Sequence, residues 1–228
     1  MTKTEMLEKF RRKLTGLEKD VIRIELEDGD GDVTRSKVGG KPYWPKDAEY
    51  PDMIFIAQIN LEEVPETEML PKKGMLQFFV SNESAYGLFD GADGYKVVYH
   101  ENIGESEDIC ARDEEYTPVI KPGIMNFRKE KEVMSWADRD FPHIPEAIED
   151  LIYSNDDYDG SGDKILGYPH FTQDDPRENG SDYDTLLLQI DTSDFIMWGD
   201  DGVANFFINS EDLRNGDFSD VLYNWDCY

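Results

Sequence analysis

Long apolar segments are missing from this sequence of 228 residues. No apolar run approaches the roughly 20 residues that a membrane-spanning helix needs, so we expect a chain without such a helix. The first residues, Met1–Glu5, lack the apolar stretch of a secretory signal, and we therefore expect a cytoplasmic protein. Aromatic residues nevertheless make up 12% of the chain. This excludes a disordered acidic tail, because such a tail has too little apolar surface to offset chain entropy.

Cysteine is also scarce, with Cys110 and Cys227 as the only two. They stand far apart and neither belongs to a C-x-x-C pair, so the sequence predicts no disulfide framework. Cys227 lies between an acidic and an aromatic neighbour, without a base that could activate it as a nucleophile. We expect both cysteines to be reduced.

Basic residues are few: 23 Lys and Arg stand against 51 Asp and Glu, for a net charge of −28. The imbalance is strongest in residues 140–228, which hold 22 acidic and three basic residues. Nucleic acid and anionic membranes carry charge of the same sign, so the composition excludes both as partners. The remaining interpretations are solubility alone and electrostatic attraction of a basic protein partner.

The N-terminal segment predicts an amphipathic helix over residues 5–19, with apolar residues at steps of three and four: Leu7, Phe10, Leu14 and Leu17. Thr2 and Glu5 have the spacing of a capping box, in which each side chain accepts a hydrogen bond from the main chain of the other. Gly16 costs about 1 kcal/mol inside a helix, so we expect the helix to end near Leu14.

Most of the remaining chain predicts strands. Residues 21–27 alternate apolar and charged side chains, as a half-buried strand does. Further apolar runs of strand length, separated by Gly, Pro and acidic turns, lie at 53–59, 75–80, 95–100, 119–127, 186–190, 195–198, 203–208 and 220–227. Pro145 and the apolar stripe around it predict a short helix near 145–153. The sequence thus predicts an α+β fold, mostly β, with an N-terminal helix and this short one.

Three blocks of sequence occur twice in the same order. They share aliphatic, glycine, proline, glutamine and aromatic positions: Lys37–Trp44 with Lys164–Phe171, Ile54–Asn60 with Leu186–Asp191, and Gly74–Val80 with Gly202–Ile208. Ordered self-similarity of this kind indicates an internal duplication. We therefore predict a single compact domain over residues 1–228, built from two related β-rich repeats at 21–135 and 155–228.

Folding requirements alone explain the features of each block. Gly40 and Gly167 stand two residues before a proline, which suits a tight turn with an unusual glycine dihedral. Gln58 and Gln189 are single amides within apolar strands, and an unpaired buried amide costs about 1–3 kcal/mol. We expect each glutamine to bond the main chain at an equivalent place in its repeat.

A family resemblance is carried by the same blocks: Gly39–Pro45, Ile54–Asn60, Gly74–Phe79, Ile196–Ile208, Tyr99–His100 and Tyr223–Cys227. These segments resemble the YwqG-like family of bacterial cytosolic proteins, a domain of unknown function, from about residue 20 to the end. The resemblance implies a largely β fold of two related halves, and no established activity, cofactor or substrate. It also implies a link to toxin systems, since some relatives stand near toxin genes.

The sequence lacks the motifs of common enzyme and metal sites. His100, His143 and His170 are far apart, and no H-E-x-x-H, phosphate-binding loop or G-x-S-x-G motif occurs. The best metal candidates match positions one, three, five and nine of a calcium-binding EF-hand loop: Asn155, Asp157, Asp159 and Asp163. Position twelve is Leu166 in place of the required Glu. An exposed acidic loop is therefore favoured, with weak Ca²⁺ binding as the alternative.

Aromatic side chains of the two repeats form a second candidate site, for a ligand. Tyr43, Trp44, His170, Phe171 and Trp198 would line a cleft between the repeats, and such clefts are common binding sites. The competing interpretation is that the same side chains fill a shared core.

Two hypotheses about function follow from these observations. The first is a non-catalytic cytosolic interaction protein whose acidic second half engages a basic protein partner, with an immunity-type role as one form. The alternative is an enzyme or small-ligand binder that uses the cleft between the repeats, with a divalent cation at the acidic loop. The sequence identifies no catalytic residue, and no cofactor beyond this Ca²⁺ candidate.

Overall fold

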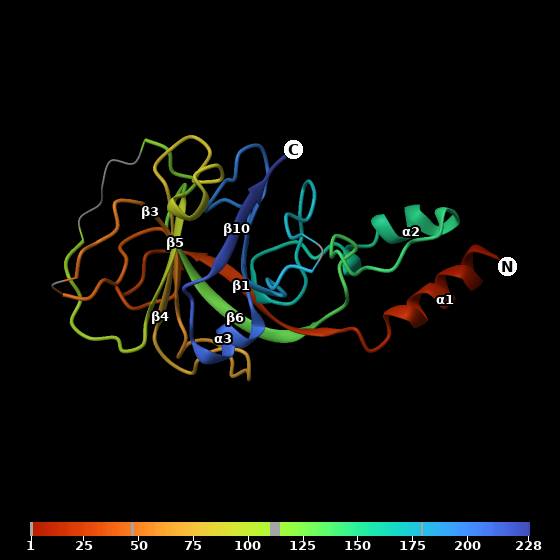
Figure 1. The fold of residues 1–228 in the computed structure, drawn as a ribbon, viewed down its shortest axis with the longest axis horizontal. Coiled ribbons are helices and arrows are strands. Elements are labelled where there is room, and N and C mark those ends of the chain that lie inside the picture. The colour runs from red at the N-terminus through yellow and green to blue at the C-terminus, as the bar shows by residue number, and fades with distance from the viewer. Residues whose placement is uncertain (1, 47, 110–114, 179) are drawn as a thin grey trace.

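Ten strands form one antiparallel sheet that nearly closes into a barrel-like shape (Figure 1). The computed structural model describes residues 2–46, 48–109, 115–178 and 180–228. The strands are β1 (Lys19–Asp28), β2 (Lys37–Val38), β3 (Ile54–Asn60), β4 (Met75–Val80), β5 (Tyr95–His100), β6 (Gly123–Glu132), β7 (Lys164–Leu166), β8 (Thr185–Asp191), β9 (Val203–Ile208) and β10 (Val221–Asp226). Their order in the sheet is β10-β9-β8-β7-β1-β6-β2-β3-β4-β5.

Within the described residues the helices are short. The α-helices are α1 (Lys3–Leu14), α2 (Glu149–Tyr153) and α3 (Ser210–Asn215), and the 3₁₀ helices are η1 (Gly91–Asp93), η2 (Glu146–Ile148) and η3 (Asp156–Tyr158). The prediction of a mostly β fold is confirmed. None of these helices combines the length and the apolar character that crossing a membrane requires.

The long β1–β6 ladder joins the two sides of the sheet, with register running from Lys19 opposite Glu132 to Asp28 opposite Gly123. The two edge strands, β5 and β10, approach each other at the far side. There the Tyr95 hydroxyl donates a hydrogen bond to the Val221 carbonyl at 2.5 Å. The rings of Tyr99 and Phe218 also lie 5.0 Å apart. These side-chain contacts bring the edges together without a strand pairing.

The interior of the sheet holds the main hydrophobic core, to which both sides contribute. Phe78 on β4 and Phe206 on β9 are fully buried, with ring centroids 4.9 Å apart. Trp198, from the loop before β9, is also fully buried in this core. Burial of large aromatic side chains contributes strongly to stability, since each removes about 150–250 Å² from water.

Helix α1 and the η2–α2 segment pack together beyond the end of the sheet (Figure 1). The capping box is confirmed: Glu5 N donates to Thr2 Oγ1 at 3.2 Å, and Thr2 N donates to Glu5 Oε2 at 2.7 Å. The helix ends at Leu14, as the glycine two positions later indicates. Phe10 and Leu14 are buried against Ile148 and Ile152, which explains the apolar stripe of both segments.

The strands that contain the repeated blocks pair in the same way. Lys37 on β2 lies opposite Gln58 on β3, and Lys164 on β7 lies opposite Gln189 on β8. Both following hairpins, β3–β4 and β8–β9, contain a register shift near the start of the first strand. The strands of the repeated blocks therefore share their pairing and their register shift on the two sides of the sheet.

The glycine turns also match. Gly40 and Gly167 have φ of 69° and 77°, in the left-handed region that favours glycine. A Cβ at either position would lie within 2.3 Å of a carboxylate oxygen, that of Asp30 or Glu132. Each carboxylate also accepts a hydrogen bond from the buried lysine of its block. The turn thus needs glycine both for its dihedral and for the space that the carboxylate takes.

Some predicted elements are wrong. Residues 195–198 are not a strand: they belong to a loop with one isolated bridge, Val119 to Ile196, closed by the Gly202 N–H to the Trp198 carbonyl. The strand predicted at 119–127 begins instead at Gly123, because Pro122 has no N–H to donate. It then continues through a charged segment to Glu132. Strands β2 and β7 and helix α3 were not predicted, since each is too short to show a periodic pattern.

Candidate ligand-binding site

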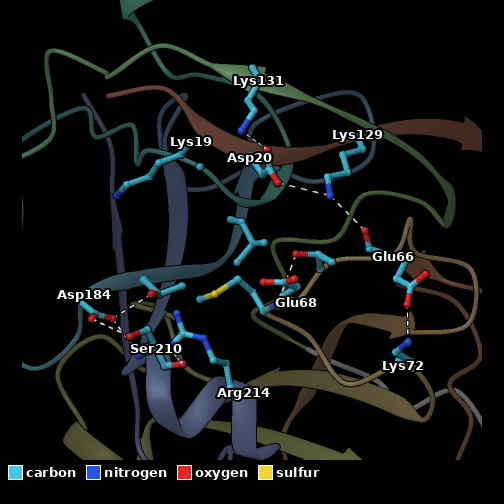
Figure 2. Close-up of a pocket in the computed structure, with 15 residues that line it drawn as sticks. Lys19, Asp20, Glu66, Glu68, Lys72, Lys129, Lys131, Asp184, Ser210 and Arg214 are labelled. Carbon is cyan, nitrogen blue, oxygen red and sulfur yellow. Dashed lines mark hydrogen bonds and ion pairs between the residues drawn. The ribbon is translucent and has the colours of Figure 1, made fainter. Parts of the chain in front are cut away.

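A cavity of about 900 Å³ opens at one end of the sheet, between its two sides (Figure 2). Its walls are the start of β1, the end of β6, the loop between β3 and β4, the end of β7, the start of β8, and α3. We call it the basic pocket because five of the chain's 23 basic residues line it: Lys19, Lys72, Lys129, Lys131 and Arg214. The acidic residues in its wall are Asp20, Glu66, Glu68 and Asp184.

The β1–β6 ladder explains why lysines face this cavity. On its inner face, Ile22 and Ile24 of β1 and Met125 of β6 are buried in the core. Side chains alternate along a strand, so the same face continues to Asp20 on β1 and to the lysines of β6. Asp20 lies directly opposite Lys131 in the ladder, and Ile22 lies opposite Lys129. The inner face therefore changes from apolar to charged where the sheet opens.

Asp20 lies between the two β6 lysines. Its Oδ1 is 2.5 Å from Lys131 Nζ, and its Oδ2 is 3.4 Å from Lys129 Nζ. The hydrogen bond from Lys131, with the charge of Lys129, holds the pKa of Asp20 below its usual value. Lys129 Nζ also donates to the Glu66 carbonyl at 3.1 Å, which ties β6 to the β3–β4 loop. Figure 2 shows both lysines directed toward Asp20.

Two further cations of the pocket come from different walls: Arg214 lies on α3, across the pocket, and Lys19 lies on β1 next to Asp20. The Arg214 guanidinium donates to the Ser210 carbonyl of its own helix at 3.1 Å, and the Lys19 ammonium lies 4.2 Å from the centre of the Tyr168 ring. Among the described residues, neither cation has a carboxylate within ion-pair distance. Loss of hydration near the protein lowers the pKa of Lys19. The charges of Lys19 and Arg214 are thus available to a ligand.

The carboxylates of the wall are mostly engaged within the protein. Asp184 accepts hydrogen bonds from Ser210 N at 2.8 Å and Ser210 Oγ at 2.9 Å, which fixes the start of α3. Glu66 forms an ion pair with Lys72. Five cationic side chains against four acidic ones leave the pocket wall slightly positive, in a chain whose net charge is −28.

The aromatic residues predicted to line a cleft lie apart from this pocket. Trp44 packs with Phe55 and Phe79, and Phe171 packs with Leu186 and Phe207, in two separate hydrophobic clusters. The structure does not bring the five predicted side chains together. Four are buried, with exposed fractions of 1% for Tyr43, 4% for Trp44, 2% for Phe171 and 0% for Trp198. The fifth, His170, contacts Asp159 through Nδ1 at 3.1 Å.

The predicted calcium ligands make separate contacts. Asn155 Oδ1 accepts from Asp157 N at 3.2 Å, and Asp159 faces His170. Asp163 Oδ1 accepts from Asp191 N at 2.7 Å. Burial, with the nearby Asp191 carboxylate, raises the pKa of Asp163 to about 7. Within the part of the chain that the structure describes, no group of three or more His, Cys, Asp or Glu side chains is arranged to hold a metal ion. The Ca²⁺ site stays a prediction.

Of the two cysteines, Cys227 is free in the structure, and Cys110 lies outside the described residues.

The residues of the basic pocket were not predicted from the sequence because they come from distant segments. One signal was present: Lys129 and Lys131 alternate with Arg128, Glu130 and Glu132, so a strand through this segment would place both lysines on one face. The strand had been predicted to end at residue 127, before that alternation begins.

Comparison with curated proteins finds no match to this chain. One family model matches residues 36–227, and its description is a domain of unknown function, DUF1963. The matched segment contains the β6 lysines, Lys72 and Arg214 of the basic pocket, whereas α1 and the start of β1 precede it. The chain therefore belongs to the DUF1963 family.

Proposed function

We propose that the protein is a non-catalytic binding protein and that its ligand is a small anion held in the basic pocket. The observation that carries the proposal is the gathering of five cationic side chains on one cavity in a chain of net charge −28. A volume of about 900 Å³ suits a ligand, since small-molecule sites commonly enclose about 300–1,000 Å³. The open end of a barrel-like sheet is also a frequent place for such sites.

The negative charge of the whole chain does not prevent anion binding at this place. Charges are screened over about 8 Å at physiological ionic strength, so distant carboxylates act weakly on a ligand inside the pocket. The ammonium and guanidinium groups of the wall act at contact distance, where charge-assisted hydrogen bonds are strongest. The pocket can therefore select anions that the remaining surface repels.

Calorimetric titration at about 150 mM salt tests the proposal, with inorganic pyrophosphate and citrate as probes. We expect binding to the wild type, and an affinity at least about tenfold lower in the double variant Lys131→Gln/Arg214→Gln. The matched control is Lys9→Gln/Arg11→Gln, which removes the same charge from the exposed face of α1. The proposal is contradicted if neither probe binds the wild type. It is also contradicted if the affinity falls equally in the two double variants.

A second candidate function is favoured by the surface of the acidic half. Of the three basic residues in 140–228, Lys164 is fully buried and Arg177 is 7% exposed, while Arg214 lines the pocket. The outer surface of this half therefore has almost no cation to offset its 22 acids. This supports an interaction protein, of the immunity type, that engages a basic protein partner in the cytoplasm of a bacterium.

Capture of partners from a bacterial lysate, at low and at high salt, tests this second candidate. A basic protein retained at low salt and released at high salt is the expected result, because screening weakens surface attraction. Retention of nothing at either salt concentration removes the candidate. Nucleic acid and anionic vesicles serve as negative controls, since the charge of the chain repels both.

We further propose that the chain is one domain over residues 1–228 whose repeats, 21–135 and 155–228, descend from one duplicated unit of a YwqG-like protein. The support is the shared hairpin register and the matching lysine, glutamine and glycine contacts of the two halves. On this proposal the basic pocket lies between the repeats. The sequence predicted a ligand cleft at this location, but with a different set of lining side chains.

A further inference from the structure

The ion pairs of Asp20 are open to competition from a ligand. The side chains of Asp20, Lys129 and Lys131 have exposed fractions of 39%, 36% and 68%, so all three contact solvent at the pocket wall. Exposed ion pairs of this kind contribute little to stability, because water and ions screen them. Breaking them therefore costs little, and the two lysines can exchange Asp20 for another anion.

The exchange selects the charge of the ligand. A monoanion that replaces Asp20 gains no more contacts with the two lysines than Asp20 already makes, and it must compete with a carboxylate that the chain holds there at high effective concentration. An anion with several negative groups gains further contacts in the same pocket. The Lys19 and Arg214 cations, which have no carboxylate partner among the described residues, are available to those groups.

We infer that the ligand is a multiply charged anion, an oligophosphate or an oligocarboxylate, and that one of its anionic groups takes the place of Asp20 between Lys129 and Lys131. This inference rests on the proposed anion-binding function. It assigns Asp20 the role of an internal competitor, which occupies the lysines until such a ligand enters. No covalent step is involved, since binding exchanges one set of ion pairs for another.

A gain of affinity on loss of Asp20 is the distinctive consequence. We expect Asp20→Asn to bind inorganic tripolyphosphate about two- to fivefold more tightly than the wild type. This ratio of affinities corresponds to the free energy of one exposed ion pair. Lys131→Gln is expected to bind it at least about threefold more weakly. Misfolding would not raise an affinity, so the gain separates competition from structural damage.

The control variant is Asp28→Asn, at the other end of β1. Asp28 forms an ion pair with Lys121 at 3.0 Å, so the substitution removes the same charge and the same kind of contact outside the pocket. Its affinity for tripolyphosphate is expected to equal that of the wild type. A tetraglutamate peptide in a parallel titration distinguishes a carboxylate ligand from a phosphate ligand, and acetate serves as the monoanion.

The outcomes separate the two proposals. If Asp20→Asn fails to gain affinity, or Asp28→Asn gains equally, or acetate binds as tightly as the larger anions, then the inference about Asp20 is wrong. In that event the anion-binding function stands if tripolyphosphate affinity still depends on Arg214. If no probe binds the wild type or Asp20→Asn, both proposals are wrong.

Discussion

Gln58 and Gln189 make matching hydrogen bonds to the main chain in the two sides of the sheet. Each Oε1 accepts from the N–H that follows the proline of its block, that of Tyr43 or His170, at 2.8 Å. Each Nε2 donates to two main-chain carbonyls: those of Val33 and Arg35 for Gln58, and those of Gly160 and Gly162 for Gln189. Both amides are fully buried and fully paired. They anchor the turn of each block to its strand.

Replacement of either glutamine by leucine is expected to destabilise the fold by at least about 2 kcal/mol, because three buried main-chain groups lose their partner. Gln58→Leu and Gln189→Leu should cost similar amounts, as measured by urea unfolding. Gln173→Leu is the control: the side chain of this exposed glutamine donates a hydrogen bond to the Cys227 carbonyl. A cost no larger than that of the control at either position would show that the amide is dispensable there.

Glu132 is expected to be the most sensitive carboxylate of β6. It is 5% exposed, and its Oε1 accepts from both Lys164 Nζ and Arg23 Nη2 at 2.7 Å. Glu132→Gln leaves the fully buried Lys164 ammonium without its counter-charge, which should cost on the order of 3–5 kcal/mol in chemical unfolding. Glu130→Gln on the same strand weakens a partly buried pair with Arg23 and an exposed pair with Arg128, and should cost about 1 kcal/mol or less. Equal costs for the two variants would contradict this account of the buried pair.

The pKa of Asp163, about 7 in the folded protein against 3.8 for an ordinary aspartate, predicts a pH dependence of stability. The folded state binds the extra proton, so this contribution is fully present below about pH 4 and is lost as the pH rises through about 7. Asp163→Asn should therefore be more stable than the wild type at pH 8, and the difference should shrink toward pH 4.

The measurement is the thermal midpoint of both proteins across this pH range. Asp157→Asn, at an exposed carboxylate of the same acidic loop, is the control and should follow the wild type at every pH. A constant offset between Asp163→Asn and the wild type from pH 4 to pH 8 would mean that the Asp163 carboxyl does not titrate there.

The sequence predicts those parts of the fold that periodicity and local chemistry decide. The strands at β4 and β5 and the Thr2–Glu5 capping box are found at the residues predicted, because each depends on neighbours in the chain. The loop at 195–198 was mistaken for a strand, since an apolar run can be buried without pairing. Trp198 shows why: it is fully buried by tertiary packing alone.

The candidate site was less accessible to sequence reasoning. The sequence predicted a cleft lined by aromatic residues. The cavity in the structure is lined mainly by charged side chains from segments far apart in the chain. Lys131 and Arg214, 83 positions apart in sequence, meet the same pocket only because the sheet curls toward closure. In a chain with 51 acids, a few lysines do not indicate a binding site from the sequence alone. Only the fold shows which of them lie close together.

A crystal structure of the protein grown with tripolyphosphate at physiological salt tests the central claim most directly. The account predicts a phosphate group between the Lys129 and Lys131 ammonium groups, with the Asp20 carboxylate turned away from them. A structure in which Asp20 keeps both ion pairs and the anion lies outside the basic pocket would contradict it.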